Sequence, residues 1–291
     1  MPGLVTHALF GQEVCRRSME EGELKRFLQK HETAYLWGLC GPDPYFTMAE
    51  GRFGMMLHLK DTEASFQAIG EYLLARKGEP CGEELLAFAL GYLGHYALDK
   101  NVHCYVFPTM KWLEETDPAC RGRNDLHGKI EMGIEWLMYQ CKRLPGQTHQ
   151  SITAQYAALA PEAAEAVDGL FRFVIQSVYG EDSSAAPYRQ GVENTLDSMK
   201  NDPPTDSLIF MEDHLNLYRR PFEMFDTPGM VLTKTVLELY DDAKEEHLAL
   251  MRQLFRCIRE GVPFAPGVTR DFSCWLFADF GWIRRYYHLS F

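Results

Sequence analysis

Three side chains that could bind a metal recur at four-residue intervals in the stretch GYLGHYALDKNVHCYV, residues 91–106: His95, Asp99 and His103. An α-helix turns 3.6 residues per lap, so side chains four and eight positions apart point to the same face. The rest of the stretch is mostly apolar, as in a buried helix, where a polar group is costly unless something satisfies it. Histidine and aspartate together suit Zn²⁺, so the spacing predicts a zinc site on this face.

Further side chains of the same types lie elsewhere in the first half of the chain: His7, Asp43, His58, His127 and Glu131. Asp43 stands between two prolines, which stiffen its loop. His127 and Glu131 are four residues apart and therefore share one helical face. All eight residues are candidate metal ligands.

Each candidate also has an interpretation without a metal. A lone histidine such as His7 or His58 is more often a surface group, a helix cap or a hydrogen-bonded core residue. An isolated HxxxE pair is most often a solvated pair that adds about 0.2–0.5 kcal/mol of helix support. For the triple on residues 95–103 the alternative is a buried hydrogen-bond network. The concentration of three ligands on a nearly apolar helix favours a metal there.

The segments that must position these side chains have apolar residues at intervals of three and four, which is typical of helices. We expect an all-α, multi-helix fold with helices at residues 5–19, 21–30, 61–76, 83–106, 124–143, 151–159, 161–179, 188–199, 206–218 and 229–260. Pro161 is suited to a first turn, and Gly261 to ending the last helix. We expect one domain over residues 1–291, in which residues 180–291 form a C-terminal helical extension packed on the rest, with the aromatic tail folded back over the body.

Composition limits the possible functions. The formal net charge of −12 argues against a stable nucleic-acid complex and against adsorption to anionic lipid, unless bound cations reverse the field locally. The N-terminus lacks the features of a secretory signal, and no window approaches the roughly 18 apolar residues of a membrane span. The eight cysteines have no CxxC pair and no regular spacing, which favours reduced thiols. We therefore expect a cytoplasmic protein.

The candidate ligands also carry a resemblance to a known family. The ordered set TH…GPD…H…HYALD…H…HxxxE, within about residues 4–140, resembles the zinc-dependent phospholipase C family. That family includes the bacterial phosphatidylcholine-preferring phospholipase C and the α-toxin catalytic domain, and its fold is shared with fungal zinc-dependent single-strand nucleases. The resemblance implies an all-α domain in which three zinc ions lie in a cleft.

The resemblance also implies a role for each candidate residue. One zinc would be held by Asp43, His58, His95 and Asp99, and a second, more exposed one by His103, His127 and Glu131. A third would be held by His7, a bridging Asp99 and the N-terminus of the chain. The secreted relatives supply an N-terminal tryptophan for this third ion, and no tryptophan precedes His7 here, so two or three ions remain open. The spacing from Asp99 to His103 is four residues in this chain, whereas it is six in the secreted enzymes.

Such a cluster would hydrolyse a phosphodiester. Zinc lowers the pKa of a bound water from about 15.7 to about 7, and two ions about 3.5–4 Å apart stabilise the attacking and leaving oxygens. Asp43 is the candidate to orient or deprotonate the attacking water, as the resemblance implies. We expect zinc-activated water to release a phospholipid headgroup. The alternatives are a nucleotidase or single-strand nuclease on the same cluster, or a non-enzymatic protein stabilised by zinc.

A choline headgroup would call for an aromatic box around its quaternary ammonium. The aromatics nearest the candidate ligands in sequence are Tyr45, Phe46, Phe53 and Tyr105. Aromatic residues at such spacing more often fill the core, so the sequence does not predict phosphatidylcholine as the substrate.

Overall fold

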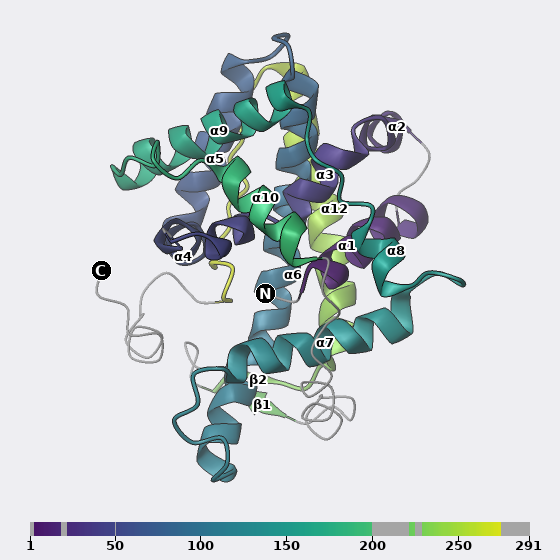
Figure 1. The fold of residues 1–291 in the computed structure, drawn as a ribbon, viewed down its shortest axis with the longest axis vertical. Coiled ribbons are helices and arrows are strands. Elements are labelled where there is room, and N and C mark those ends of the chain that lie inside the picture. The colour runs from purple at the N-terminus through teal and green to yellow at the C-terminus, as the bar shows by residue number, and fades with distance from the viewer. Residues whose placement is uncertain (1–2, 19–21, 50, 200–220, 225–228, 275–291) are drawn as a thin grey trace.

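The computed structural model describes residues 3–18, 22–49, 51–199, 221–224 and 229–274, and in these almost all of the regular secondary structure is helical (Figure 1). This confirms the all-α class. The helices are α1 (Leu4–Glu13), α2 (Glu23–Lys30), α3 (Glu32–Leu39), α4 (Arg52–Leu59), α5 (Thr62–Ala75), α6 (Gly82–Thr116), α7 (Leu126–Lys142), α8 (His149–Thr153), α9 (Pro161–Tyr179), α10 (Tyr188–Ser198) and α12 (Val236–Glu260). A π-helix, η1 (Val14–Ser18), continues α1, and a 3₁₀ helix, η2 (Asp43–Thr47), follows α3. Two short antiparallel strands, β1 (Phe222–Glu223) and β2 (Val231–Leu232), complete the described elements.

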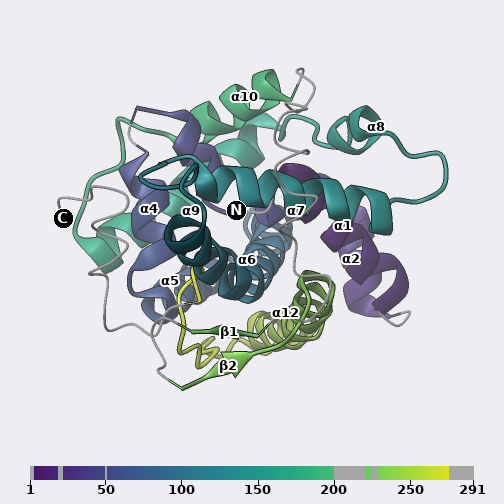
Figure 2. The ribbon, with the colours of Figure 1, turned by 90° about the horizontal axis from the view of Figure 1, so that it is seen from below.

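Helix α6 is the centre of the architecture. Its 35 residues are packed against α3 on one side and α12 on another, and α7 and α1 also contact it. Figure 2 shows α6 between these elements, with α12 and the β1–β2 pair on one side and α7 and α1 on another. Most residues of α6 from Leu85 to Met110 are buried, because the helix is apolar on nearly every face. Among the described residues, no helix is both long enough and apolar enough to cross a membrane.

Two glycines let α3 and α6 touch backbone to backbone. A methyl group on Gly38 would lie 2.0 Å from the carbonyl oxygen of Phe88, and one on Gly91 would lie 2.1 Å from that of Tyr35. Only glycine allows this approach, because any Cβ would overlap the opposing backbone. The contact brings the C-terminal end of α3 and the loop after it against the middle of α6.

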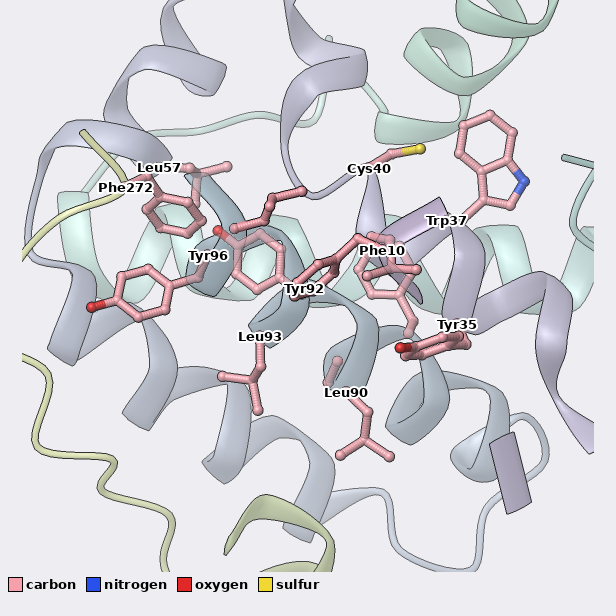
Figure 3. Close-up of a cluster of buried hydrophobic side chains, with 14 of the residues drawn as sticks. Phe10, Tyr35, Trp37, Cys40, Leu57, Leu90, Tyr92, Leu93, Tyr96 and Phe272 are labelled. Atoms are coloured by element: carbon pink, nitrogen blue, oxygen red, sulfur yellow. The ribbon is translucent and has the colours of Figure 1, made fainter. Parts of the chain in front are cut away.

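The core also contains residues from far along the chain, among them Phe272. Figure 3 shows Phe272, which follows α12, beside Leu57 of α4 and close to Tyr96 of α6. The rings of Phe272 and Tyr96 meet edge to face with their centroids 5.1 Å apart. Phe272 is fully buried. The segment after α12 therefore packs into the body of the helical domain.

Several predicted helices agree with the structure to within two residues, and others differ. Helix α9 begins at Pro161, and Gly261 ends α12 in the left-handed conformation, as predicted. The helix predicted at residues 5–19 divides into α1 and η1, and residues 229–235 precede α12 because β2 lies there. The prediction for 206–218 lies outside the described residues.

Three differences have identifiable causes. Helix α6 continues to Thr116, past the predicted end at 106, although Pro108 removes one backbone hydrogen bond. Burial of Val106, Phe107 and Met110 offsets that loss. Helices α3 and α4 were not predicted, because each has only eight residues and a glycine inside it.

The prediction that all eight cysteines are reduced thiols is wrong for one pair. Cys104 of α6 and Cys274 form a disulfide across 170 residues of sequence, with their Cα atoms 5.5 Å apart. The spacing of cysteines in a sequence does not reveal such a pair, because the pairing depends on the fold. The other six cysteines are free thiols.

Candidate metal centre

The structure brings the eight predicted ligands together in three groups, each with ligand atoms within 4.8 Å of one another. We call these the inner group (Asp43, His58 and His95), the outer group (His103, His127 and Glu131) and the His7 group (His7, His95 and Asp99). His95 belongs to two of them. Helix α6 supplies His95, Asp99 and His103, so one helix contributes to all three groups, as the four-residue spacing predicted.

The inner group has separations suited to a metal. The Nε2 atom of His58 lies 3.2 Å from Oδ1 of Asp43 and 3.2 Å from Nε2 of His95, and His95 Nε2 lies 3.4 Å from Asp43 Oδ1. Tetrahedral zinc with bonds of about 2.0–2.1 Å separates its ligand atoms by roughly 3.3–3.4 Å. The three atoms thus have the spacing of three corners of such a tetrahedron.

The orientation of the two rings points to a cation between them. The Nδ1 atom of His58 donates to the carbonyl oxygen of Gly54 at 2.7 Å, and Nδ1 of His95 donates to that of Leu39 at 3.0 Å. A neutral imidazole carries one proton, so with Nδ1 donating, both Nε2 atoms present lone pairs to each other. Two facing lone pairs at 3.2 Å repel unless a proton or a metal lies between them. Such outer hydrogen bonds on Nδ1 are typical of zinc-binding histidines.

Asp99 faces both the inner group and the His7 group. Its Oδ2 lies 3.4 Å from Nε2 of His95 and 3.6 Å from Nε2 of His58, whereas its Oδ1 lies 3.3 Å from Nε2 of His7. The side chain is fully buried, and neither oxygen has a hydrogen-bond partner among the described residues. A buried carboxylate without partners is costly, and a metal would satisfy it.

The outer group lies one helical turn further along α6 and is closer to solvent. The Nε2 atom of His103 lies 3.3 Å from that of His127 and 3.1 Å from Oε1 of Glu131, and His127 and Glu131 approach to 2.5 Å. The Nδ1 atom of His103 donates to the carbonyl oxygen of Phe272 at 2.8 Å. The side chain of His127 is 16% exposed, whereas those of His7, His95 and Asp99 are fully buried. The outer group is thus the most accessible of the three.

Burial and charge set different protonation states for these histidines. Burial lowers the pKa of His95 to about 4 and that of His103 to about 3, so both rings are neutral at pH 7, as a metal ligand must be. Burial would also lower the pKa of His58, but the carboxylates of Asp43 and Asp99 outweigh it and raise that pKa to about 9. Burial would raise the pKa of Asp99, but neighbouring histidines, His95 above all, hold it well below its usual range.

We therefore expect zinc binding at the inner group to displace one proton from His58. With a pKa of about 9, His58 is protonated at pH 7 in the metal-free protein. The apparent zinc affinity should rise about tenfold per pH unit from pH 6 and level off above pH 9. The proton itself stabilises the metal-free fold below pH 6.5, and this stabilisation, on the order of 3 kcal/mol, is lost as the pH rises through about 9.

Competition with a chelator at pH 6, 7 and 8 measures the affinity, and calorimetry in two buffers of different ionisation enthalpy counts the proton. The variant His58→Asn is the control and should release no such proton. A zinc affinity at the inner group that does not change over this pH range would contradict the protonation of His58.

Sequence reasoning missed the groups that orient these ligands. The carbonyl oxygens of Leu39, Gly54 and Phe272 each accept from one ligand histidine. Gly41 has a φ of +53°, and a methyl group there would lie 2.3 Å from the ring of His95. Backbone carbonyls carry no signature of residue type, so the sequence offered no signal for them. A glycine in the GPD motif was the one visible hint.

The aromatic residues near the ligands are mostly core, as the sequence favoured. Tyr45, Phe53 and Tyr105 are each 1% exposed. Phe46 differs, because it is 40% exposed while its ring lies 5.3 Å from that of His58, centroid to centroid. An exposed apolar ring therefore stands beside the inner group.

Comparison with known proteins agrees with this geometry. A family model described as zinc dependent phospholipase C matches residues 6–172, which is more than half of the chain and includes all eight ligand candidates. No curated protein matches the chain significantly. No solved structure does so either.

Proposed function

Because the chain belongs to the zinc-dependent phospholipase C family, we propose that it is a zinc-dependent phosphodiester hydrolase that releases the phosphorylated headgroup of a phospholipid. The inner group together with Asp99 would hold one zinc, and the outer group a second. The His7 group would hold a third, with Asp99 as the bridge, so the count is two or three ions.

One observation carries the proposal: consecutive turns of α6 present a sealed set of ligands and, directly beside it, a set that reaches solvent. The inner and His7 groups are buried, which suits ions that stay bound and supply a fixed positive charge. The outer group, through His127, is where a phosphate from solution could approach. A purely structural zinc would not need access to solvent, because structural zinc sites are closed by protein ligands.

Within this site each residue has a distinct task. Zinc, when bound, supplies an acidic water and neutralises negative charge on the phosphate. Asp43 is a buried member of the inner group and would accept the proton of the attacking water on a carboxylate oxygen. With zinc bound, His58 and His95 would be neutral, and their Nε2 atoms are directed inward because backbone carbonyls accept their Nδ1 protons.

A lipid substrate is favoured over a polynucleotide by two features. Phe46 places an exposed apolar ring beside the inner group, where it can contact the apolar part of a lipid. The net charge of −12 leaves no general attraction for a polynucleotide backbone.

The cytoplasmic location remains a prediction that has lost part of its basis. It depended in part on eight reduced thiols, and Cys104 and Cys274 form a disulfide. Disulfides are most common in oxidising compartments.

The experiment that tests the function compares substrates with and without a chelator. We expect purified protein to hold at least two equivalents of zinc and to release phosphorylated headgroup from phosphatidylcholine or phosphatidylethanolamine vesicles. A nucleoside 3′-phosphate, single-stranded DNA and an aryl phosphodiester complete the panel. A chelator should abolish the activity, and added zinc should restore it.

The variant Asp43→Asn tests the assignment of Asp43 as the base and should lose hydrolytic activity. Asp168→Asn is its matched control and should keep that activity. Asp168 is a buried aspartate of α9 that accepts from the backbone N–H of Arg189 and belongs to none of the three groups. Activity confined to the nucleotide substrates would replace the proposal by a nuclease function. Full zinc content with no hydrolysis of any substrate would favour a protein that zinc only stabilises.

A further inference from the structure

We propose that the turn Asp271–Cys274 is a positioning element for the metal centre, and that the disulfide Cys104–Cys274 holds it in place. The turn lies outside residues 6–172, which the family model matches. The inference rests on the proposed metal ligands but not on the identity of the substrate. It assigns Phe272 as a positioning residue that acts through both the inner and the outer group.

The first contact orients the outer group. The carbonyl oxygen of Phe272 accepts the Nδ1 proton of His103 at 2.8 Å. This hydrogen bond fixes the tautomer in which the Nε2 atom of His103 is directed toward His127 and Glu131. Without this carbonyl, the buried Nδ1 proton of His103 would lack this acceptor, and this hydrogen bond would no longer fix the orientation of the imidazole ring.

The same residue also contacts the inner group, on its other side. The backbone N–H of Phe272 donates to the carbonyl oxygen of His58 at 3.2 Å. Its ring lies 5.1 Å from that of His58 and 5.7 Å from that of His95, centroid to centroid. Phe272 therefore touches both groups at once, by its carbonyl on one side and by its N–H and ring on the other.

The turn around Phe272 is itself held rigidly. Oδ1 of the fully buried Asp271 accepts the N–H of Ser273 at 2.8 Å, and the carbonyl oxygen of Asp271 accepts that of Cys274 at 3.1 Å. One residue earlier, the hydroxyl of Tyr96 donates to the carbonyl oxygen of Arg270 at 2.9 Å. The turn is thus tied to α6 before Phe272 as well as after it.

The disulfide completes the attachment. Cys104 directly follows His103 on α6, and Cys274 is two residues after Phe272. The covalent bond and the hydrogen bond from His103 to Phe272 therefore join the same two segments side by side. Cys274 also has a φ of +67°, in the left-handed region that residues other than glycine rarely adopt. A backbone held in that conformation indicates that its surroundings determine it.

The role of the disulfide is tested with the variants Cys104→Ser and Cys274→Ser, each measured as the full-length zinc-loaded protein. Because both remove the same bond, they should have the same effect, and the double variant should lose no more than either one. We expect the most weakly held zinc, assigned to the outer group, to be bound about 10- to 100-fold less tightly, the range typical when an outer hydrogen bond to a ligand is lost. Chelator competition measures each class of zinc separately.

The matched control is Cys257→Ser, a buried free cysteine on α12 that belongs to none of the three groups. It should leave every zinc affinity unchanged. The visible absorption spectrum of the cobalt-loaded protein gives a second readout, because it reports the coordination geometry and is insensitive to a loss of stability alone. Cys104→Ser should change this spectrum and Cys257→Ser should not.

A second variant keeps the inference testable if the cysteine variants fold poorly. Phe272→Ala keeps the carbonyl but removes the ring, so it should weaken the zinc at the inner group, and Phe272→Leu should restore part of the loss. Equal losses at all zinc classes, or none at all, would overturn the positioning role. A wild-type protein that binds no zinc would instead refute the proposed function, so the two failures are distinguishable.

Discussion

Asp99→Asn is expected to lose zinc from both groups that the residue faces. The substitution keeps the shape but removes a negative charge from a fully buried position among three histidines. The loss of affinity should exceed the 10- to 100-fold that is typical of outer hydrogen-bond partners, because the proposed assignment makes Asp99 a direct ligand. At a zinc concentration of about 100 times the wild-type Kd, a protein that no longer binds would forgo roughly 2.7 kcal/mol of stabilisation.

Elemental analysis after zinc repletion and thermal unfolding with and without chelator measure both effects. Glu131→Gln is the comparison within the site and should lose mainly the ion of the outer group. Asp168→Asn is the comparison outside it and should keep all zinc. If Asp99→Asn holds as much zinc as the wild type, the bridging assignment is wrong.

Gly41→Ala should displace His95 and with it the metal of two groups. The new methyl group would lie 2.3 Å from the ring, far below any contact that real Cβ atoms make. The ring has no room to withdraw, because its Nδ1 proton is bonded to Leu39 and its face stacks on His7 with centroids 4.5 Å apart. The backbone would also be strained, since a φ of +53° costs alanine about 1–2 kcal/mol.

The control variant Gly122→Ala separates the effect of the clash with the His95 ring from the effect of backbone strain. Gly122 has a similar φ of +69°, but nothing lies within 4 Å of the added methyl group. This control should lose about the same backbone energy and keep its zinc, whereas Gly41→Ala should lose zinc as well. Zinc retention in Gly41→Ala, measured by elemental analysis, would mean that His95 is not required in the position described.

The features of the centre that depend on side-chain type and helical period could be predicted from the sequence. His95, Asp99 and His103 share a face because four residues nearly complete a turn, and His127 and Glu131 pair for the same reason. Their assembly with the other candidates followed from the resemblance to a family whose match the comparison confirms. The all-α class followed from apolar periodicity alone.

The remaining features depend on contacts between distant segments, which no local pattern records. The acceptors for the ligand histidines are backbone carbonyls, and any residue supplies one. The pairing of Cys104 with Cys274 depends on where the residues after α12 pack. The spacing of the cysteines in the sequence does not reveal it. Helix α6 continues through Pro108 to Thr116, past the predicted end at residue 106, because the residues around Pro108 are buried.

The disulfide that spans 170 residues also has a consequence for the order of events during synthesis. A chain emerges from the ribosome from its N-terminus, at about 5–20 residues per second, and early segments begin to fold first. His7, Asp43 and the histidines of α6 are all exposed to solution and to zinc before Phe272 and Cys274 have been made. An ion captured at that stage would meet an outer group without its orienting carbonyl, so the proposed coordination would be complete only after the segment that follows α12 has docked. With the proposed ligands, metal loading would be completed only after translation has passed residue 274.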